Sequence, residues 1–252
     1  MQEKSKPVDN LRADAEKIIT RAIAAVLPDA AVERALKEKT FLGRVYLVAA
    51  GKAAWQMAHA ARACLQDNFC GGVVVTKYGH VKGEIADVAC FEGGHPVPDE
   101  NSLRGTDAAL ALTEDLTESD TVVFLLSGGG SALFEKPLLP LAELQDVTNQ
   151  LLAAGADIVE INTIRKRLSA VKGGRFARHC APAQVFAVVL SDILGDPLDM
   201  IASGPAYPDS SSCAQALDIA KRYGLRLSER AWALLAQETP KTLKNVETQI
   251  TG

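Results

Sequence analysis

The stretch that most constrains the fold is TVVFLLSGGGSAL, residues 121–133. Its first six residues are apolar or β-branched, which is typical of a strand buried on both faces in a parallel sheet. The strand passes directly into Ser127 and three successive glycines, which let the backbone approach a ligand closely and turn its N–H groups toward an anion. The same pattern fits an ordinary turn between a strand and a helix, so an anion site and a simple turn both remain open.

Similar strand–loop–helix units recur along the chain. The other strand-like runs are rich in apolar residues and lie at 44–49, 72–76, 87–91 and 184–190. Helical patterns follow most of them, at 53–65, 99–116, 140–154 and 157–168. This alternation predicts an α/β fold, a doubly wound, mostly parallel sheet with helices on both faces, as one Rossmann-like three-layer domain over residues 1–252. Such sheets bind ligands at the carboxyl ends of their strands, so the loops there form the candidate site.

Further predictions concern the two ends of the chain. A helix beginning near Asp9 carries an apolar stripe and is predicted to pack on the rest of the domain; the stripe comprises Leu11, Ala15, Ile18, Ile19, Ala22 and Val26. Helices are also predicted at 30–39, 210–223 and 228–236. The last residues, 241–252, are predicted to form a strand or a linker.

Lys52 lies where the strand at 44–49 meets the helix that begins near Ala53. The positive end of a helix dipole repels an ammonium unless an anion lies between them, and phosphate often binds at such ends. A lysine that reaches into solvent at a turn is the alternative. The segment is not a Walker A loop, because Tyr46 and Ala53 stand where that motif requires Gly and Ser or Thr.

Two further loops are predicted to reach the same edge of the sheet. One is EGGHP at 92–96, and the other is SDILGDP at 191–197, which carries Asp192 and Asp196. Carboxylates at the end of a strand can hold Mg²⁺ or polarise a substrate hydroxyl, although Asp, Gly and Pro are also ordinary turn residues. The predicted topology gathers Lys52, both loops and residues 127–131 on one face.

Residues 162–175, NTIRKRLSAVKGGR, are the basic part of the chain. Arg165, Lys166, Arg167 and Lys172 fall within eight residues of one another. Arginine binds carboxylate and phosphate through a planar fork and lysine acts as a point charge, so one hypothesis is a contact with a carboxylate substrate or a nucleotide tail. The alternative is a solvated helix face followed by a capping glycine, which is the usual role of such runs.

Composition and net charge limit the kinds of molecule that the chain is expected to bind. With 48% hydrophobic residues and a net charge of −4, the chain has material for a core and no electrostatic reason to bind nucleic acid or an anionic membrane. The five cysteines form no C-x-x-C pair and the four histidines are scattered, which predicts reduced thiols and no zinc cluster. The N-terminus lacks the apolar core of a signal peptide and no stretch approaches a membrane span, so we expect a cytoplasmic protein that binds small molecules.

Two enzyme classes fit the motifs less well. A dinucleotide site requires G-x-G-x-x-G after the first strand, where this chain has AAGKAA. Serine hydrolases use a G-x-S-x-G turn, and neither Ser127 nor Ser131 lies in one. A non-enzymatic ligand-binding domain stays open, because glycines that cradle a ligand do not imply turnover.

Five longer segments carry a family resemblance. In chain order they are LVAAGKAAWQMAHAA, CFEGGHPVPDENSLRGTDAALAL, FLLSGGGSALFEKP, INTIRKRLSAVKGGRFA and VVLSDILGDPLDMIASGP. Together they resemble the N-terminal domain of class II glycerate kinases, the glycerate 2-kinases associated with the MOFRL domain, over nearly the whole chain. These motifs are long and far more specific than any single glycine loop.

The resemblance implies phosphorylation of D-glycerate to 2-phosphoglycerate, with ATP and Mg²⁺. Lys52 matches the family's catalytic lysine, Asp192 would act on Mg²⁺ or on the attacking hydroxyl, and Asp196 would be a further metal ligand. The residues that would bind substrate or phosphate are Gly51, Gly93, Gly94, His95, Ser127, Gly128, Gly129, Gly130, Ser131, Asn162, Arg165 and Lys172. Phosphoryl transfer depends mostly on positioning and charge neutralisation, and these residue types supply both. The residues do not say which loop takes ATP and which takes glycerate.

The resemblance to this family also leaves two alternative functions open. Its full-length members continue into a C-terminal MOFRL domain, and we expect this chain to end before it. Some members bear the name hydroxypyruvate reductase, an NAD(P)H-dependent activity against which the missing dinucleotide motif argues. A non-catalytic ligand-binding fragment is the other alternative. A homo-oligomer is compatible with the sequence, because a chain lacking that domain is expected to expose the apolar surface where it docks.

Overall fold

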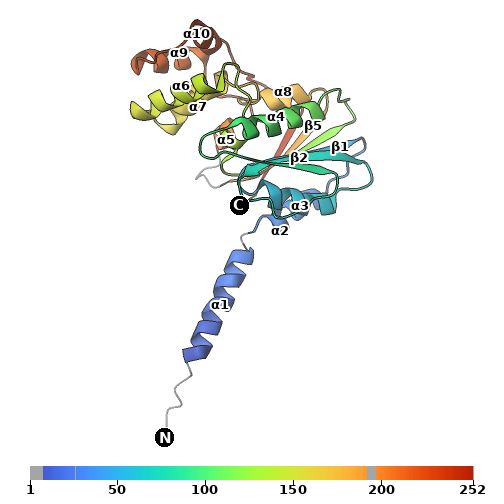
Figure 1. Cartoon of the computed structure of the whole chain (residues 1–252). Coiled ribbons are helices and arrows are strands. Elements are labelled where there is room, and N and C mark those ends of the chain that lie inside the picture. The colour runs from blue at the N-terminus through green and yellow to red at the C-terminus, as the bar shows by residue number, and fades with distance from the viewer. Residues whose placement is uncertain (1–7, 26, 192–196, 252) are drawn as a thin grey trace.

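The fold is built on one six-stranded parallel sheet. The computed structural model describes residues 8–25, 27–191 and 197–251, and in this part of the chain the strand order is β3-β2-β1-β4-β5-β6 (Figure 1). The strands are β1 (Val45–Ala50), β2 (Phe69–Lys77), β3 (Val88–Gly93), β4 (Thr121–Leu126), β5 (Gln184–Leu190) and β6 (Val246–Thr251). The order reverses between β1 and β4, which makes that pair the topological switch point where ligands of such sheets bind. The predicted fold class is confirmed.

Helices cover both faces of the sheet (Figure 1). One face carries α2 (Asp29–Lys37) and α3 (Ala54–Cys64), and the other carries α4 (Glu100–Leu112), α5 (Gly130–Leu133) and α8 (Arg175–Cys180). Alternate strand residues enter the two cores, because successive side chains of a strand point to opposite faces. Leu125 packs toward α3, whereas the ring of Phe124 meets Phe134 and Phe176, with centroids 5.6 and 4.9 Å away.

Four helices form a separate group at one end of the sheet (Figure 1). They are α6 (Leu141–Ala153), α7 (Ile158–Arg167), α9 (Cys213–Arg222) and α10 (Glu229–Leu235). Their apolar faces make a third core around Leu144, Ile164, Ile219 and Leu235. The sequence predicted these helices but not that they would pack on one another, because periodicity shows that a helix has an apolar face and not what that face contacts.

Two predicted helix starts are confirmed atom by atom. Asp99 caps α4 by accepting a hydrogen bond from the Ser102 amide at 2.9 Å. Asp157 caps α7 by accepting from the Glu160 amide at 2.9 Å, and the Glu160 carboxylate accepts from the Asp157 amide at 3.0 Å. Such caps satisfy backbone N–H groups that the helix itself cannot pair.

The prediction for the first helix is confirmed in part, and the prediction for the final segment is confirmed. Helix α1 (Val8–Ala25) forms as predicted, but it projects away from the sheet (Figure 1). Its residues Leu11, Ile18, Ile19 and Ile23 are 57–68% exposed, so nothing in the described chain covers the predicted packing face. The final segment, predicted as a strand or linker, pairs in parallel with β5 as the edge strand β6. In the described part of the chain no helix is both long and apolar enough to cross a bilayer.

Candidate functional site

The carboxyl ends of β1 and β4 are joined into one frame. The Ser127 amide donates to Ala50 O at 3.0 Å, the Lys52 amide donates to Gly128 O at 2.8 Å, and Ser127 Oγ accepts from the Ala53 amide at 3.0 Å. Gly51 has φ +123°, and a Cβ there would lie 2.3 Å from Ser127 Oγ. The predicted loops therefore meet, with Ser127 joining them and Gly51 required for the close approach.

Gly129 is the point where three loops converge. A Cβ on Gly129 would lie 2.9 Å from the His95 ring and 3.1 Å from Lys52 Cγ, so these two side chains lie against the glycine. Gly93 and Gly94 allow the chain to reach His95, because a Cβ on Gly93 would lie 2.5 Å from Ser102 Oγ in α4 and a Cβ on Gly94 would lie 2.5 Å from Val97 O in the loop. The missing side chains of these two glycines thus allow β3 to pack on α4 and the loop to fold tightly on itself.

The surroundings of Gly129 form a cationic centre. Burial lowers the pKa of His95, and the charges of Lys52, Lys77 and His80 lower it further. Among the described residues, no carboxylate oxygen lies within 4.0 Å of Lys52 Nζ or Lys77 Nζ. A hollow of about 340 Å³ opens beside Lys52, with Lys82 also on its wall. An unneutralised cluster of this kind favours an anionic ligand.

A row of polar side chains supports the end of the glycine loop. Ser131 Oγ lies 3.0 Å from Ser203 Oγ, which donates to Asn162 Oδ1 at 2.8 Å. Ala202 and Ser203, in the short helix η1 (Ile201–Ser203), have φ of 50° and 63°, a left-handed conformation that costs a residue with a side chain about 1–2 kcal/mol. Strain of this kind concentrates at functional sites.

Arg165 and Lys172 hold the same loop from beneath. Arg165 Nη2 and Lys172 Nζ donate to Ser131 O at 2.9 and 2.8 Å, and Lys172 also donates to Phe134 O at 2.9 Å. The buried carboxylate of Glu135 lies 3.7 Å from Arg165 and 3.4 Å from Lys172. Burial lowers the pKa of Lys172 to about 8, although the Glu135 charge opposes this. Both cations therefore position the loop, and Lys172 has no exposed surface through which to contact a ligand.

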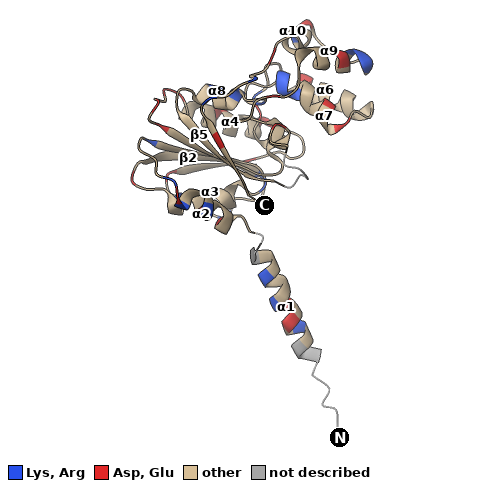
Figure 2. Cartoon of the chain, turned by 180° about the vertical axis from the view of Figure 1, so that it is seen from behind, with Lys and Arg blue, Asp and Glu red and all other residues tan. Residues whose placement is uncertain are grey.

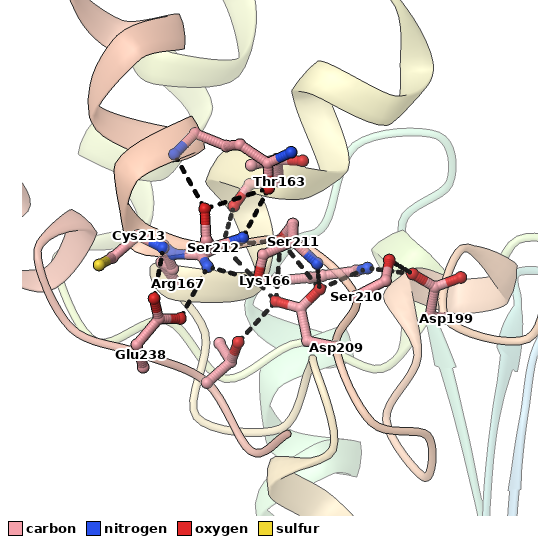
Figure 3. Close-up of polar contacts among 12 residues, drawn as sticks. Thr163, Lys166, Arg167, Asp199, Asp209, Ser210, Ser211, Ser212, Cys213 and Glu238 are labelled. Atoms are coloured by element: carbon pink, nitrogen blue, oxygen red, sulfur yellow. Dashed lines mark hydrogen bonds and ion pairs between the residues drawn. The ribbon is translucent and has the colours of Figure 1, made fainter. Parts of the chain in front are cut away.

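Lys166 and Arg167 are fully buried and belong to a different network (Figure 3). Lys166 Nζ lies 3.0 Å from Asp209 and 3.2 Å from Asp199, and Arg167 donates to Ser211 Oγ at 2.9 Å. Burial would raise the pKa of Asp209, but the Thr239 hydroxyl and the Lys166 ammonium bring it below its usual range. These basic residues lie in the last turn of α7; Figure 2 marks all described Lys and Arg positions of the chain in blue. The solvated-face interpretation of this run is wrong, because its charges are buried and paired.

A family model matches the chain over residues 14–236, with the description "Domain of unknown function (DUF4147)". The chain belongs to the DUF4147 family. A D-glycerate 2-kinase of Thermotoga maritima is 54% identical over 97% of this chain, and the chain spans 59% of that relative's length. A crystal structure of glycerate kinase from Thermotoga maritima superposes with a TM-score of 0.87 at 53% identity, over 96% of this chain and 59% of that one.

Another relative bears a different name. A protein of Agrobacterium vitis, 42% identical over 89% of this chain and matched over 52% of its own length, is provisionally named a hydroxypyruvate reductase. The predicted resemblance to class II glycerate kinases is confirmed at the level of family, since the DUF4147 relatives include named glycerate kinases. The chain spans little more than half the length of these relatives.

Two candidate residues of this DUF4147 domain lie outside the described residues. They are Asp192 and Asp196, which the sequence predicted as metal ligands. Among the residues that the structure does describe, no group of three or more His, Cys, Asp or Glu side chains is arranged to hold a metal ion. Ser203 and Glu135 were not singled out from the sequence. The Ser-Gly-Pro sequence that follows Ala202 could have identified Ser203, whereas no motif in the neighbouring sequence identifies Glu135.

Proposed function

We propose that this domain contributes to a glycerate 2-kinase, which transfers the γ-phosphoryl group of ATP to D-glycerate and forms 2-phosphoglycerate. The observation that carries the proposal is the convergence of Lys52 and His95 on Gly129, at the β1/β4 switch point, with no neutralising carboxylate among the described residues. The names of relatives up to 54% identical support the same activity. A phosphoryl group in transfer carries spread negative charge, which such a centre stabilises.

The proposed roles follow from what each side chain contacts. Lys52 acts on the transferring phosphoryl group, because its ammonium is exposed and has no carboxylate partner in the described chain. His95 lies beside it, and its lowered pKa favours a neutral ring that donates a hydrogen bond. Gly51 and residues 128–130 keep the backbone close to the phosphates.

A further group positions these residues. Ser131, Asn162, Arg165 and Lys172 fix the end of the glycine loop through the hydrogen bonds described above, and Ser127 fixes its start. An error of about 1 Å in such positioning costs about a hundredfold in rate, so these contacts matter even where they do not touch a ligand.

For Mg²⁺, we propose Asp192 and Asp196 as the ligands. The described residues offer no alternative cluster, and the two aspartates follow a strand that ends beside β4. Held there, Mg²⁺ would neutralise part of the negative charge of the phosphates. We also expect a cytoplasmic protein with small-molecule substrates and no nucleic-acid partner.

One comparison of reactions tests the function. The protein is supplied with ATP and D-glycerate while ADP is followed, and with hydroxypyruvate and NADH while NADH is followed. We expect ADP only in the first reaction, with 2-phosphoglycerate identified by ³¹P NMR. Consumption of NADH would support the reductase, against which the AAGKAA sequence after β1 argues. Binding of ATP without turnover in either assay would favour a ligand-binding domain.

A further inference from the structure

A cavity of about 190 Å³ lies between the loop after β3 and the helices α6 and α7. Its walls are mostly apolar, and they include Val97, Leu144, Leu152, Ile158 and Ile161. Sites for small organic ligands have this character, apolar walls with a few polar groups, but usually enclose about 300–1,000 Å³. A cavity of this size therefore suits one flat part of a larger ligand.

The polar groups of the cavity suit a heteroaromatic ring. Arg165 lines it, is 9% exposed, and its Nε is buried with no hydrogen-bond partner among the described residues. A buried polar atom without a partner is uncommon in folded proteins and calls for an explanation. A guanidinium plane stacks on aromatic rings, and the side-chain amide of Asn149 in the cavity wall can pair with the donor and acceptor edge of adenine. The neighbouring Gln145 amide donates to Pro98 O at 3.0 Å.

The cavity adjoins the cationic centre at two points. Pro96 in its wall directly follows His95, whose ring lies against Gly129. On the other side, Arg165 donates to Ser131 O at the end of the glycine loop. A ligand with a ring at one end and phosphates at the other therefore spans the two sites.

We propose that this cavity is the subsite for the purine base of the nucleotide, with the phosphates extending to Lys52 and His95. The proposal rests on the proposed kinase function and assigns the end of the site that takes ATP. Glycerate suits the cavity less well than a ring, because most of the walls are apolar and burying its carboxylate and hydroxyls against them is costly.

The test compares binding of ADP with binding of inorganic tripolyphosphate, which has no base, by calorimetric titration of the chain. Thr148→Trp fills the cavity from α6, and Leu152→Asp places a charge in its wall at a side chain that is 59% exposed, so folding is not at risk. We expect each variant to bind ADP at least tenfold more weakly, about 1.4 kcal/mol, and tripolyphosphate as tightly as wild type. The matched control is Ala142→Trp, an exposed site on α6 outside the cavity, which should change neither affinity.

Three outcomes would overturn the subsite: unchanged ADP binding in both variants, equal loss of ADP and tripolyphosphate binding, or no ADP binding by the wild-type chain. Failure of the kinase function would show separately, as no phosphoryl transfer to D-glycerate.

Discussion

The chain holds two groups of cations that its sequence does not distinguish. Lys52 lies against Gly129, and the charges of Lys52 and Lys77 both act on the adjoining His95 ring. Neither lysine has a carboxylate partner in the described chain. Lys166 and Arg167 lie in the α7 network with no exposed surface, neutralised by Asp199 and Asp209. The difference teaches that the partner of a charge, and not its residue type, decides whether it binds a ligand or holds the fold together.

The reason lies in desolvation. A buried charge must recover the free energy of hydration that it loses, so a buried cation persists only with carboxylates and hydrogen bonds around it. An exposed cation loses little hydration and needs no partner, which leaves its charge for a ligand. Mutation of the buried group should therefore lower the stability of the fold, whereas mutation of the exposed group should lower activity.

The largest effect is expected from Asp209→Ala. Asp209 pairs with Lys166 and Arg167 and accepts hydrogen bonds from Ser211 and Thr239, so its loss leaves buried charge unpaired. We expect the free energy of unfolding to fall by about 3–5 kcal/mol, measured by urea denaturation. In the control, Asp218→Ala removes a carboxylate that is 75% exposed, and should cost under about 1 kcal/mol. An equal loss of unfolding free energy in the two variants would contradict the distinction between buried and exposed charges.

The second largest effect is expected from Lys52→Ala, which removes the exposed lysine beside Gly129. If the proposed kinase function holds, turnover should fall about a hundredfold, as it does on loss of a contact made in the transition state, while urea denaturation stays unchanged. The exposed Lys37 on α2 serves as the control, and Lys37→Ala should alter neither quantity. Near-normal turnover of Lys52→Ala would reassign Lys52 to solvent.

A smaller effect is expected from Asp99, whose carboxylate accepts hydrogen bonds from uncharged donors. Burial raises its pKa, but hydrogen bonds from Tyr78, Ser102 and Gly94 outweigh this and lower the pKa to about 2. Its contribution is therefore fully present above the unfolded pKa, about 4, and is lost as pH falls toward 2.

Asp99→Ala should accordingly cost about 1 kcal/mol at pH 7, the usual value of a helix N-cap, and less as pH falls from about 5 to 2. Urea denaturation at several pH values measures this change. A cost that does not vary with pH would show that the charge of Asp99 contributes nothing beyond its hydrogen-bonding geometry.

The smallest effect is a change in titration without a change in fold. The charge of Lys52 contributes to the lowered pKa of His95, so Lys52→Met should raise that pKa, and so should binding of tripolyphosphate, which adds negative charge. NMR titration of the His95 ring measures both. Lys37→Met is the control and should leave the titration of His95 unaltered. An unchanged His95 pKa in Lys52→Met would separate the two residues and contradict a common anion site.

Much of the architecture was predictable from sequence. The strands at 121–126 and 184–190 and the helix caps at Asp99 and Asp157 lie where the patterns placed them. These features depend on neighbours within a few residues, such as a run of apolar side chains or a carboxylate three residues before the amide that it caps. The shared edge of the site also followed, because parallel strands bring their carboxyl ends together.

The sequence by itself determined the strands, the caps, the glycine loops and the family. Only the tertiary structure decided that His95 lies against Gly129, that Ser203 supports Ser131, and that Asp209 neutralises Lys166, 43 residues away. It also decided that Leu11, Ile18 and Ile19 of α1 stay exposed while α6 and α7 pack on each other. The physical reason is that periodicity and capping are local, whereas the partner of a charge or an apolar face depends on which distant segments the fold brings beside it.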